Sequence, residues 1–373
     1  MKKSFAVVSL FLCVTLCLTM AFASGAGSSD PLVSLSYLTG LFSSSVNESV
    51  DTKLTNADTE LRGELQQQLD TMEAAVSAAA GQNFASSPTE ADLKAGDILT
   101  GPTGLSVVHL AGTVRVELDS GTVVDVSTGK EIASGTILSA NHRYLVAESS
   151  VARFIVLSPT AVLTYEGNYA FSLSPNTPDY FSVARALNAL SLFQGTGTGF
   201  GGGFDLHKAP TRAEGLVMFI RILGEENAAL ACNYQHPFTD VPEWADRYVA
   251  WAYYQGYTNG VGGGKFGTQQ TISAIEYQEF LLRALGYSIA GVHDYSTSLE
   301  RALEHGALTE GEYRLLHSED FLRCHVVYLS YYSLDMILSG SQQTLAQRLL
   351  NAGVFSPQQY SHAFSLVNSL RIF

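Results

Sequence analysis

One stretch of this chain occurs twice, and the spacing of the two copies constrains the fold more than any other feature. Phe204 aligns with Phe266 and Gly224 with Gly286, and both pairs are 62 positions apart. Each copy predicts a helix, a glycine-rich loop, an aromatic residue, a polar turn and a second helix. A fixed internal period of this size is typical of stacked supersecondary units that bury their apolar faces against one another.

The glycine-rich loop of the first copy also satisfies the spacing G-x-G-x-x-G, at Gly197, Gly199 and Gly202. A dinucleotide-binding fingerprint needs a strand before the glycines and a helix that begins at the last one. Here a helical period precedes the glycines, and "FDLHKAP" follows them. We therefore interpret the glycines as residues that supply left-handed backbone conformations between two helices, and we expect no cofactor.

The N-terminus predicts a secretory signal peptide, residues 1–23. Two lysines precede an apolar run, and the run ends at the small-residue exit "AFA". An uncleaved membrane anchor is the alternative, but the run is short for a bilayer span. Removing 1–23 would change the net charge from −14 to about −16, a value that excludes a nucleic-acid partner. Cys232 and Cys324 would remain, and we favour two buried thiols over one disulfide.

Residues 24–45 are small and polar and predict an arm. Over 46–80, apolar residues recur at spacings of three, four or seven and predict one amphipathic helix. Its single apolar stripe indicates a partner, either the following domain or a second copy in a homo-oligomer. Residues 81–92 are interpreted as a linker.

From 93 to 175 the apolar period is two, as in "TVRVEL", and turn residues separate the runs. This pattern predicts an all-β module, a sandwich or barrel of about eight strands. His109 and His142 are interpreted as strand or turn residues, because no nucleophile or carboxylate pair can be assigned to either.

The remaining residues predict helices. In the second copy, Asp240 is a candidate N-cap ahead of Pro242, and Tyr248 is expected in the core. Trp244 lies near a helix start beside a loop and is a candidate ligand contact.

The segments "PFTDVPEWADRYVAWAYYQGYTNG" and "KAPTRAEGLVMFIRILG" resemble the S-layer homology (SLH) repeat, whose T-R-A-E motif is matched by 211–214. A third, weaker copy includes "FLRCHVVYLSYYSL". The three units cover about 179–226, 238–288 and 295–340 within a domain spanning 176–340, and a helical tail follows at 341–373.

The resemblance implies an all-α, pseudo-threefold repeat domain, which makes the whole chain a multidomain α+β protein. It also implies that a secondary cell-wall polysaccharide, often pyruvylated, is bound between repeats by the motif arginine. A guanidinium suits this role because it can hold a carboxylate through two parallel hydrogen bonds. By resemblance Arg212 binds the polymer, with Thr211 and Glu214 forming a capping box, and Arg323 is its counterpart in the third unit.

The motif is incomplete in two units. Ala274 replaces the arginine of the second unit, and His325 replaces the glutamate of the third. A structural role for Arg212, paired with Glu214 or with a helix end, is the alternative to ligand binding. Arg221 and Arg283 are interpreted as surface residues with buried stems.

We therefore expect a secreted, non-enzymatic protein of the cell wall or S-layer, anchored noncovalently through these repeats and outside the membrane once the signal is removed. The first alternative is a secreted adhesion module whose repeats are purely structural and whose β module binds an outside partner. The second is a wall-polysaccharide hydrolase, which would need two carboxylates across a cleft. Candidates such as Asp125, Glu148 and Glu166 are interpreted as solvated strand or turn residues.

Overall fold

The computed structural model describes residues 42–79, 83–197, 199–288 and 296–373. The chain divides into two compact units, an N-terminal one over 1–80 and a C-terminal one over 81–373. The predicted signal peptide 1–23 and most of the predicted arm 24–45 lie outside the described residues. Among the residues that are described, no helix is both long enough and apolar enough to cross a membrane.

In the N-terminal compact unit, the described residues form one long helix, α3 (Ser43–Ala79), which confirms the helical period of the sequence. The stripe residues Val50, Leu54 and Leu61 have exposed fractions of 47%, 63% and 56%. Nothing within this unit covers them among the described residues, because a single helix has no second element on which to pack its apolar side.

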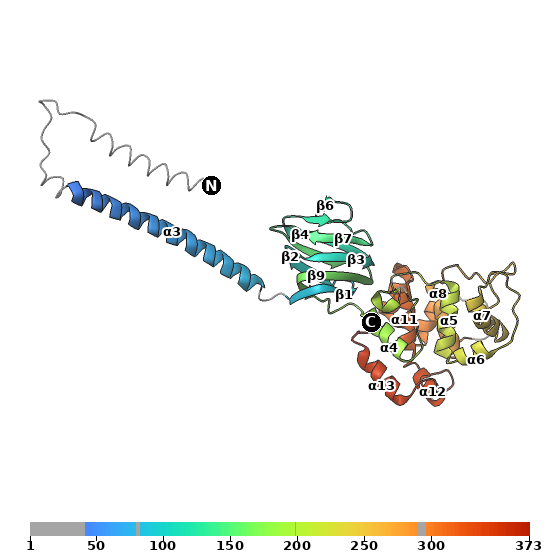
Figure 1. The fold of residues 1–373 in the computed structure, drawn as a ribbon. Coiled ribbons are helices and arrows are strands. Elements are labelled where there is room, and N and C mark those ends of the chain that lie inside the picture. Colours follow the sequence, from blue (N-terminus) through green and yellow to red (C-terminus); the bar gives the residue numbers. More distant parts are fainter. Residues whose placement is uncertain (1–41, 80–82, 198, 289–295) are drawn as a thin grey trace, which may run out of the picture. The chain divides into compact units, whose positions relative to one another are not determined.

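The C-terminal compact unit begins with a curled antiparallel sheet, half of a barrel, shown in cyan and green in Figure 1. Its described strands follow the order β4-β8-β2-β9-β3-β7-β5-β6, and β1 pairs with β9. Their bounds are β1 Asn83–Lys94, β2 Ile98–Pro102, β3 Ser106–Ala111, β4 Val114–Ser120, β5 Val123–Asp125, β6 Lys130–Ile132, β7 His142–Val146, β8 Val151–Val156 and β9 Thr160–Ser172.

The sheet buries alternate residues, as the two-residue period predicts. In β8, Ala152, Phe154 and Val156 are buried while the residues between them are half-buried. His109 is buried, with Nε2 3.1 Å from the carbonyl oxygen of Gly112. His142 Nδ1 lies 2.8 Å from a carboxylate oxygen of Asp125, beside a turn. Both histidines are therefore strand residues, as interpreted.

The sheet starts earlier than the sequence predicts. Strand β1 occupies most of 81–92, for which a linker is expected, and it pairs with β9 from Asn83 to Lys94. The segment is polar, and few of its side chains are buried, so it has no two-residue apolar period to reveal it. Pairing with β9, rather than its own sequence, makes it a strand.

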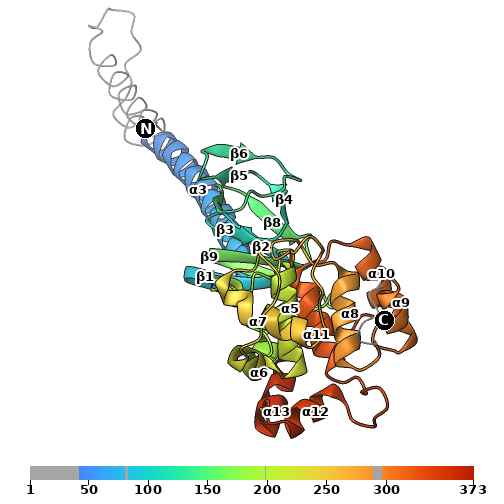
Figure 2. The same ribbon diagram turned by 90° about the vertical axis from the view of Figure 1, so that its right-hand side faces the viewer.

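The other elements of the C-terminal compact unit are α-helices (Figure 2), apart from the short 3-10 turn η2 Gly201–Gly203. The helices are α4 Tyr180–Ala189, α5 Arg212–Leu223, α6 Glu226–Ala231, α7 Glu243–Tyr254, α8 Ala274–Ala284, α9 Ser298–Glu304, α10 Glu310–Ser318, α11 Arg323–Ser333, α12 Leu345–Asn351 and α13 Pro357–Leu366. The last two form the predicted helical tail.

The second helices of the three predicted units share one buried core. Helix α5 contacts α8, α8 contacts α11, and α11 packs on α4, while α13 covers the other side of α4 (Figure 1). The core includes Phe219 and Phe280, whose rings stack 4.7 Å apart between α5 and α8. Aromatic residues of two second helices therefore meet between the units.

The glycine loop joins the helices to the sheet. Gly199, Gly201 and Gly202 have φ values of 90°, 57° and 63°, as predicted for residues that reverse the chain. The backbone N–H of Gly201 donates to Oε1 of Glu90 in β1 at 2.9 Å. Only one of the two thiols is buried as expected: Cys324 is buried, Cys232 is partly exposed, and both are free.

Candidate functional site

The predicted capping box at the T-R-A-E motif is present. Thr211 is the N-cap of α5, and its backbone N–H donates to Oε2 of Glu214 at 2.7 Å. The Glu214 N–H donates in return to Oγ1 of Thr211 at 3.2 Å. Ser273 and Glu276 form the same box at the start of α8. These reciprocal bonds fix where each second helix begins and therefore where the motif side chains lie.

Arg212 is buried, with 7% of its surface exposed, and it does not pair with Glu214. Its Nη1 donates instead to Oε1 of Glu276, the motif glutamate of the second unit, at 2.7 Å. The guanidinium also lies 5.4 Å from the ring centre of Phe266. The alternative of a structural pair with Glu214 is wrong in its partner, because the ion pair joins two repeats rather than one helix to itself.

Arg323 repeats this arrangement between the third and first units. It is buried, and its Nη1 lies 3.1 Å from Oε1 of Glu214. Its Nε donates to the backbone carbonyl of Phe204 at 3.1 Å, and its guanidinium lies 5.4 Å from the ring centre of Phe193. Glu214 thus caps α5 with one oxygen and binds the third unit's arginine with the other.

The link from the second unit to the third lacks both charges. Ala274 occupies the arginine position and His325 the glutamate position. The Nδ1 of His325 accepts the backbone N–H of Leu322 at 3.1 Å, the bond that a capping glutamate would make. Burial lowers the pKa of His325 to about 4, so the ring is neutral near pH 7.

A cavity of about 140 Å³ lies beside Arg212. The loop 256–260 and one face of α8 line it, including Glu279 and Arg283. Only 8% of the Arg283 side chain is exposed, and its Nε and Nη1 donate to Oε1 of Glu279 and to the Tyr257 carbonyl at 2.9 and 2.7 Å. The interpretation of Arg283 as a surface residue is therefore wrong, because its guanidinium forms the wall of a cavity.

Glu279 stays ionised although it is buried. Burial alone would raise its pKa, but hydrogen bonds from Ser288, Ser298, Arg301 and Arg283 lower the pKa below its ordinary value. The floor of this cavity is therefore an ion network in which one buried carboxylate binds two guanidinium groups, those of Arg283 and Arg301.

A second cavity, of about 440 Å³, lies beside Arg323. Its walls are the loop 194–196, the α5 residues Glu214 and Arg221, and the α7 residues Trp244 and Tyr248. Three of the predicted site residues, Glu214, Arg323 and Trp244, therefore meet here, whereas Arg212 lines the other cavity.

The aromatic residues of this second cavity differ in exposure. Trp244 is 54% exposed, while Tyr248 is buried, as predicted for a core residue, and its hydroxyl donates to Oε1 of Glu226 at 2.7 Å. Arg221 donates to the same carboxylate oxygen at 2.8 Å and is half-buried, with 11% of its side chain exposed, so its guanidinium lies in the cavity wall rather than in open solvent.

Asp240 is not the N-cap of α7, a place taken by Pro242. Its carboxylate accepts the backbone N–H groups of Phe266, Gly267 and Thr268 at 2.7, 2.9 and 3.3 Å. The Asp240 prediction is therefore wrong. Its side chain folds the glycine loop of its own repeat onto the turn before α7, a long-range role that a cap-like position does not reveal.

Sequence reasoning missed Arg221, Arg283 and Glu279 as cavity residues. A signal was available for the two arginines, because the 62-residue period aligns them with each other, as it aligns Glu214 with Glu276. The contribution of Glu279 depends on partners from a distant helix, Ser298 and Arg301 in α9, and has no local signature.

Comparison with known proteins agrees with the motif. The S-layer homology domain model matches residues 237–274, from the turn before α7 to the start of α8. A protein named "Cell surface protein" from Thermoanaerobacter kivui is 29% identical over 140 residues, 37% of this chain and 18% of that protein. The chain thus spans less than a fifth of the length of this relative.

Among solved structures, a chain of the wild-type Clp1p–Pcf11p complex aligns with 75% of this chain and 66% of its own length. The sequence identity is 11% and the TM-score is 0.12, too low to inform the fold. The T-R-A-E capping box, the repeated helix pairs and the matched segment lead to one conclusion. The chain is an S-layer homology domain-containing protein.

Proposed function

We propose that this is a non-catalytic cell-surface protein, held noncovalently to an acidic wall polysaccharide by the cavities at Arg323 and Arg212. The S-layer homology match supports an anchoring role, and the name of the Thermoanaerobacter kivui relative supports a surface location. The proposed arrangement is a closed ring of three repeats. Its support is the order of the ion pairs, from the first unit to the second and from the third to the first.

The cavity at Arg323 carries the proposal. Its volume of about 440 Å³ lies in the range of ordinary ligand sites, ~300–1,000 Å³, whereas the cavity at Arg212 is smaller. Trp244 presents a half-exposed indole at this cavity, a flat apolar surface on which the face of a sugar ring can pack. Arg323 and Arg221 supply the guanidinium groups.

The ligand chemistry follows from these groups. A sugar carboxylate, such as a pyruvate ketal, would bind the guanidinium of Arg323 in competition with Glu214. At long range the mature chain, at about −16, repels an anionic polymer. Affinity therefore has to come from short-range contacts within the cavities, with several weak sites acting together along one polymer.

The state of the carboxylates that line the two cavities supports a binding role there rather than catalysis. A glycosidase needs a carboxylic acid whose pKa is raised so that it can protonate the leaving oxygen. Glu279 has a lowered pKa, and Glu214 and Glu276 are each engaged by a buried arginine. The proposal therefore assigns these residues to positioning and binding.

The experiment is co-sedimentation of the mature chain with purified wall sacculi. Trp244→Ala should reduce retention about tenfold, since truncating a central aromatic contact costs on the order of 1–2 kcal/mol. Arg323→Lys keeps the charge but loses the planar fork, and it should reduce retention as well. The matched control is Tyr254→Ala, because Tyr254 is an aromatic residue of the same helix, 61% exposed and not part of either cavity lining.

Equal retention of Trp244→Ala and Tyr254→Ala would contradict the proposal. Circular dichroism of each variant separates loss of binding from loss of folding. Sacculi stripped of their secondary polymer provide the ligand control, since binding that survives stripping would indicate another wall component.

Helix α3 offers a separate surface, and we propose a second copy of the chain as its partner. The stripe that includes Val50, Leu54 and Leu61 follows the spacing of a helix-pairing face and is exposed within its own unit. Leu61→Asp should lower the mass measured by analytical ultracentrifugation. An unchanged monomer mass in both proteins would contradict self-association.

A further inference from the structure

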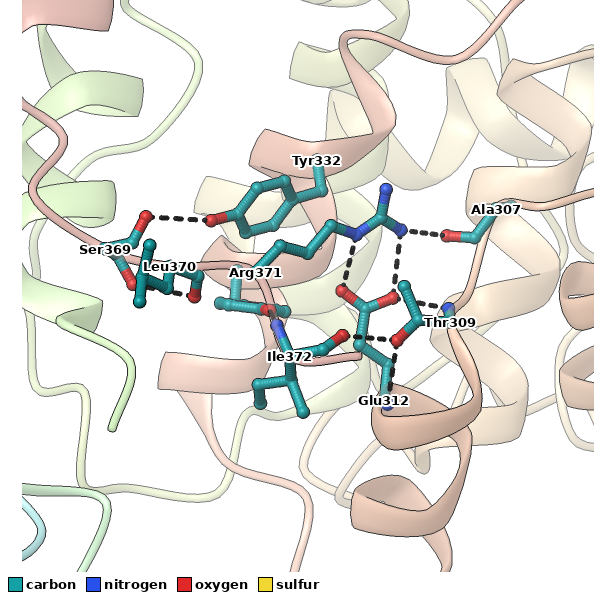
Figure 3. Close-up of polar contacts among 9 residues, drawn as sticks. Ala307, Thr309, Glu312, Tyr332, Ser369, Leu370, Arg371 and Ile372 are labelled. Carbon is teal, nitrogen blue, oxygen red and sulfur yellow. Dashed lines mark hydrogen bonds and ion pairs between the residues drawn. The ribbon is translucent and has the colours of Figure 1, made fainter. Parts of the chain in front are cut away.

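The last residues of the sequence bind back onto the third repeat. Arg371 reaches α10, where its Nε and Nη2 donate to the two carboxylate oxygens of Glu312 at 2.8 and 2.9 Å (Figure 3). This is a bidentate pair, and the Glu312 side chain is only 1% exposed. Burying that carboxylate without a cation would be strongly unfavourable, so Arg371 is needed wherever Glu312 is buried.

The same guanidinium makes two further contacts. Its Nη2 donates to the backbone carbonyl of Ala307 at 3.1 Å, and its centre lies 5.1 Å from the ring centre of Tyr332 on α11 (Figure 3). Burial alone would lower the pKa of Arg371. The hydrogen bonds to Glu312 and the charge of that carboxylate raise the pKa above its ordinary value.

Hydrogen bonds to its backbone hold Ile372, the residue that follows this arginine. The Ile372 N–H donates to the hydroxyl of Tyr328 at 2.7 Å, and the Thr309 hydroxyl donates to the Ile372 carbonyl. A Cβ at Gly311 would lie 2.5 Å from the carbonyl oxygen of Phe373, so the close approach of the segment requires glycine there. The segment is thus seated in a fitted site rather than laid on a surface.

The location of this site is set by the repeat. The first helix of each unit ends with the same backbone bond, to the residue five positions earlier. The donors are Leu192, Tyr257 and Ala307, at 2.9, 2.8 and 2.7 Å. The Ala307 carbonyl therefore corresponds to the Tyr257 carbonyl. In the second unit that carbonyl accepts a hydrogen bond from Arg283, and in the third it accepts one from Arg371.

The second helices show what Arg371 replaces. Arg221 and Arg283 each lie nine positions after the motif-arginine position, and the same position of the third unit is Tyr332. Helix α11 therefore lacks the cavity arginine of the other two units. Arg371 stacks on that tyrosine and brings a guanidinium to the equivalent carbonyl.

We propose that the third repeat has exchanged polymer binding for self-binding: residues 368–373 are an intramolecular ligand that fills its site and supplies the missing guanidinium through Arg371. The site recognises an arginine side chain flanked by apolar residues, with Glu312, the Ala307 carbonyl and the Tyr332 ring as its contacts. That the other two sites take wall polymer rests on the proposed function, whereas the docking of the segment does not.

The test separates the segment from its site. A chain ending at Val367 is titrated against a fluorescein-labelled, C-terminally amidated peptide of sequence NSLRIF, and binding is followed by fluorescence anisotropy. Saturable binding to the shortened chain and none to the full chain is expected. The peptide with alanine in place of arginine should bind at least tenfold more weakly. The proposal would be overturned if the shortened chain is folded but does not bind the peptide, or if it binds both peptides with equal affinity.

A second measurement covers the case in which the shortened chain does not fold. In the full chain, Arg371→Ala should speed hydrogen exchange of the Ile372 amide at least tenfold, while Arg314→Ala, an exposed arginine on the same helix as Glu312, should not. Unchanged exchange in Arg371→Ala would overturn the proposal.

Wall binding distinguishes this inference from the proposed function. Arg371→Ala should change retention on sacculi by less than twofold, because the vacated site has Ala274 and His325 at the motif positions. A larger change in either direction would overturn the exchange of roles. If Trp244→Ala and Arg323→Lys left retention unchanged while the peptide still bound, the proposed function alone would fail.

Discussion

The ion pair between Arg212 and Glu276 should be a main source of coupling between the first two repeats. The perturbation is a double-mutant cycle of Arg212→Ala, Glu276→Ala and the double variant. The pair suits this design because Glu276 divides its oxygens, with Oε1 on Arg212 at 2.7 Å and Oε2 on the backbone N–H of Ser273 at 2.9 Å. The cycle cancels the capping contribution and leaves the ion pair.

The expected magnitude follows from burial. Two unit charges about 4 Å apart interact by about 4 kcal/mol at the effective dielectric constant of ~20 near a protein surface. The side chains of Arg212 and Glu276 are 8% and 27% exposed, so water screens the carboxylate in part. A coupling free energy of about 2–3 kcal/mol is expected. Arg212→Ala alone should lower the free energy of unfolding by about 3–5 kcal/mol, because it leaves the Glu276 carboxylate without its cation.

Urea unfolding followed by tryptophan fluorescence measures these values. The chain contains two tryptophans, Trp244 and Trp251, and both lie on α7, so the signal reports on the repeats. Arg314→Ala, which removes an exposed arginine of α10, is the control and should cost less than about 1 kcal/mol. A coupling below about 0.5 kcal/mol would refute the reasoning, since that value is typical of a solvent-exposed pair.

Two further predictions test other parts of the molecule. Because the pKa of His325 is about 4 when folded and near 6.5 when unfolded, the unfolded state takes up the proton first. The free energy of unfolding should therefore fall by up to about 3 kcal/mol as the pH drops from 6.5 to 4, and His325→Gln should lose this dependence in urea titrations. In the sheet, Gly112 has φ 86° and a Cβ there would lie 2.3 Å from the Thr160 carbonyl oxygen. Gly112→Ala should cost about 2–4 kcal/mol in thermal unfolding, against about 1 kcal/mol for Gly129→Ala, where the space is open.

The helices and the capping box of α5 were predictable because their signals are local. The capping boxes that begin α5 and α8 each lie within four consecutive residues, and the apolar period of α3 is legible over its whole length. The all-β character of the sheet followed from its two-residue period in the same way. These features need no knowledge of what packs where.

The candidate site was predictable only in part, because its contacts join residues far apart in the sequence. Self-comparison aligns Glu214 with Glu276 as equivalent positions, but it does not say which arginine each of them binds. Their partners, Arg323 and Arg212, come from neighbouring repeats and are set by packing. Strand β1 was missed for the same reason, since pairing with β9 decides its conformation.

The order of the ion pairs gives one physical reason for both departures from the motif. The first unit uses both of its charged motif residues, because Arg212 binds the second unit and Glu214 binds the third unit's Arg323. The second unit uses only its glutamate and the third only its arginine. The positions without charge, Ala274 and His325, are therefore the two ends of a single link.

The energetics of buried charge favour the loss of both charged residues of that link over the loss of only one. An arginine at position 274 facing a neutral imidazole, or a glutamate at 325 facing a methyl group, would leave an uncompensated charge at a site where Ala274 and His325 are 7% and 2% exposed. Such a charge costs about 3–5 kcal/mol, whereas removing both partners of a buried pair can be nearly neutral. The third repeat instead holds a different pair, Arg371 with Glu312, and the arginine of that pair comes from outside the repeat. Motif residues are thus retained where a partner is in place, and the third unit, which has Tyr332 at the position of Arg221 and Arg283, is the one that the C-terminal segment completes.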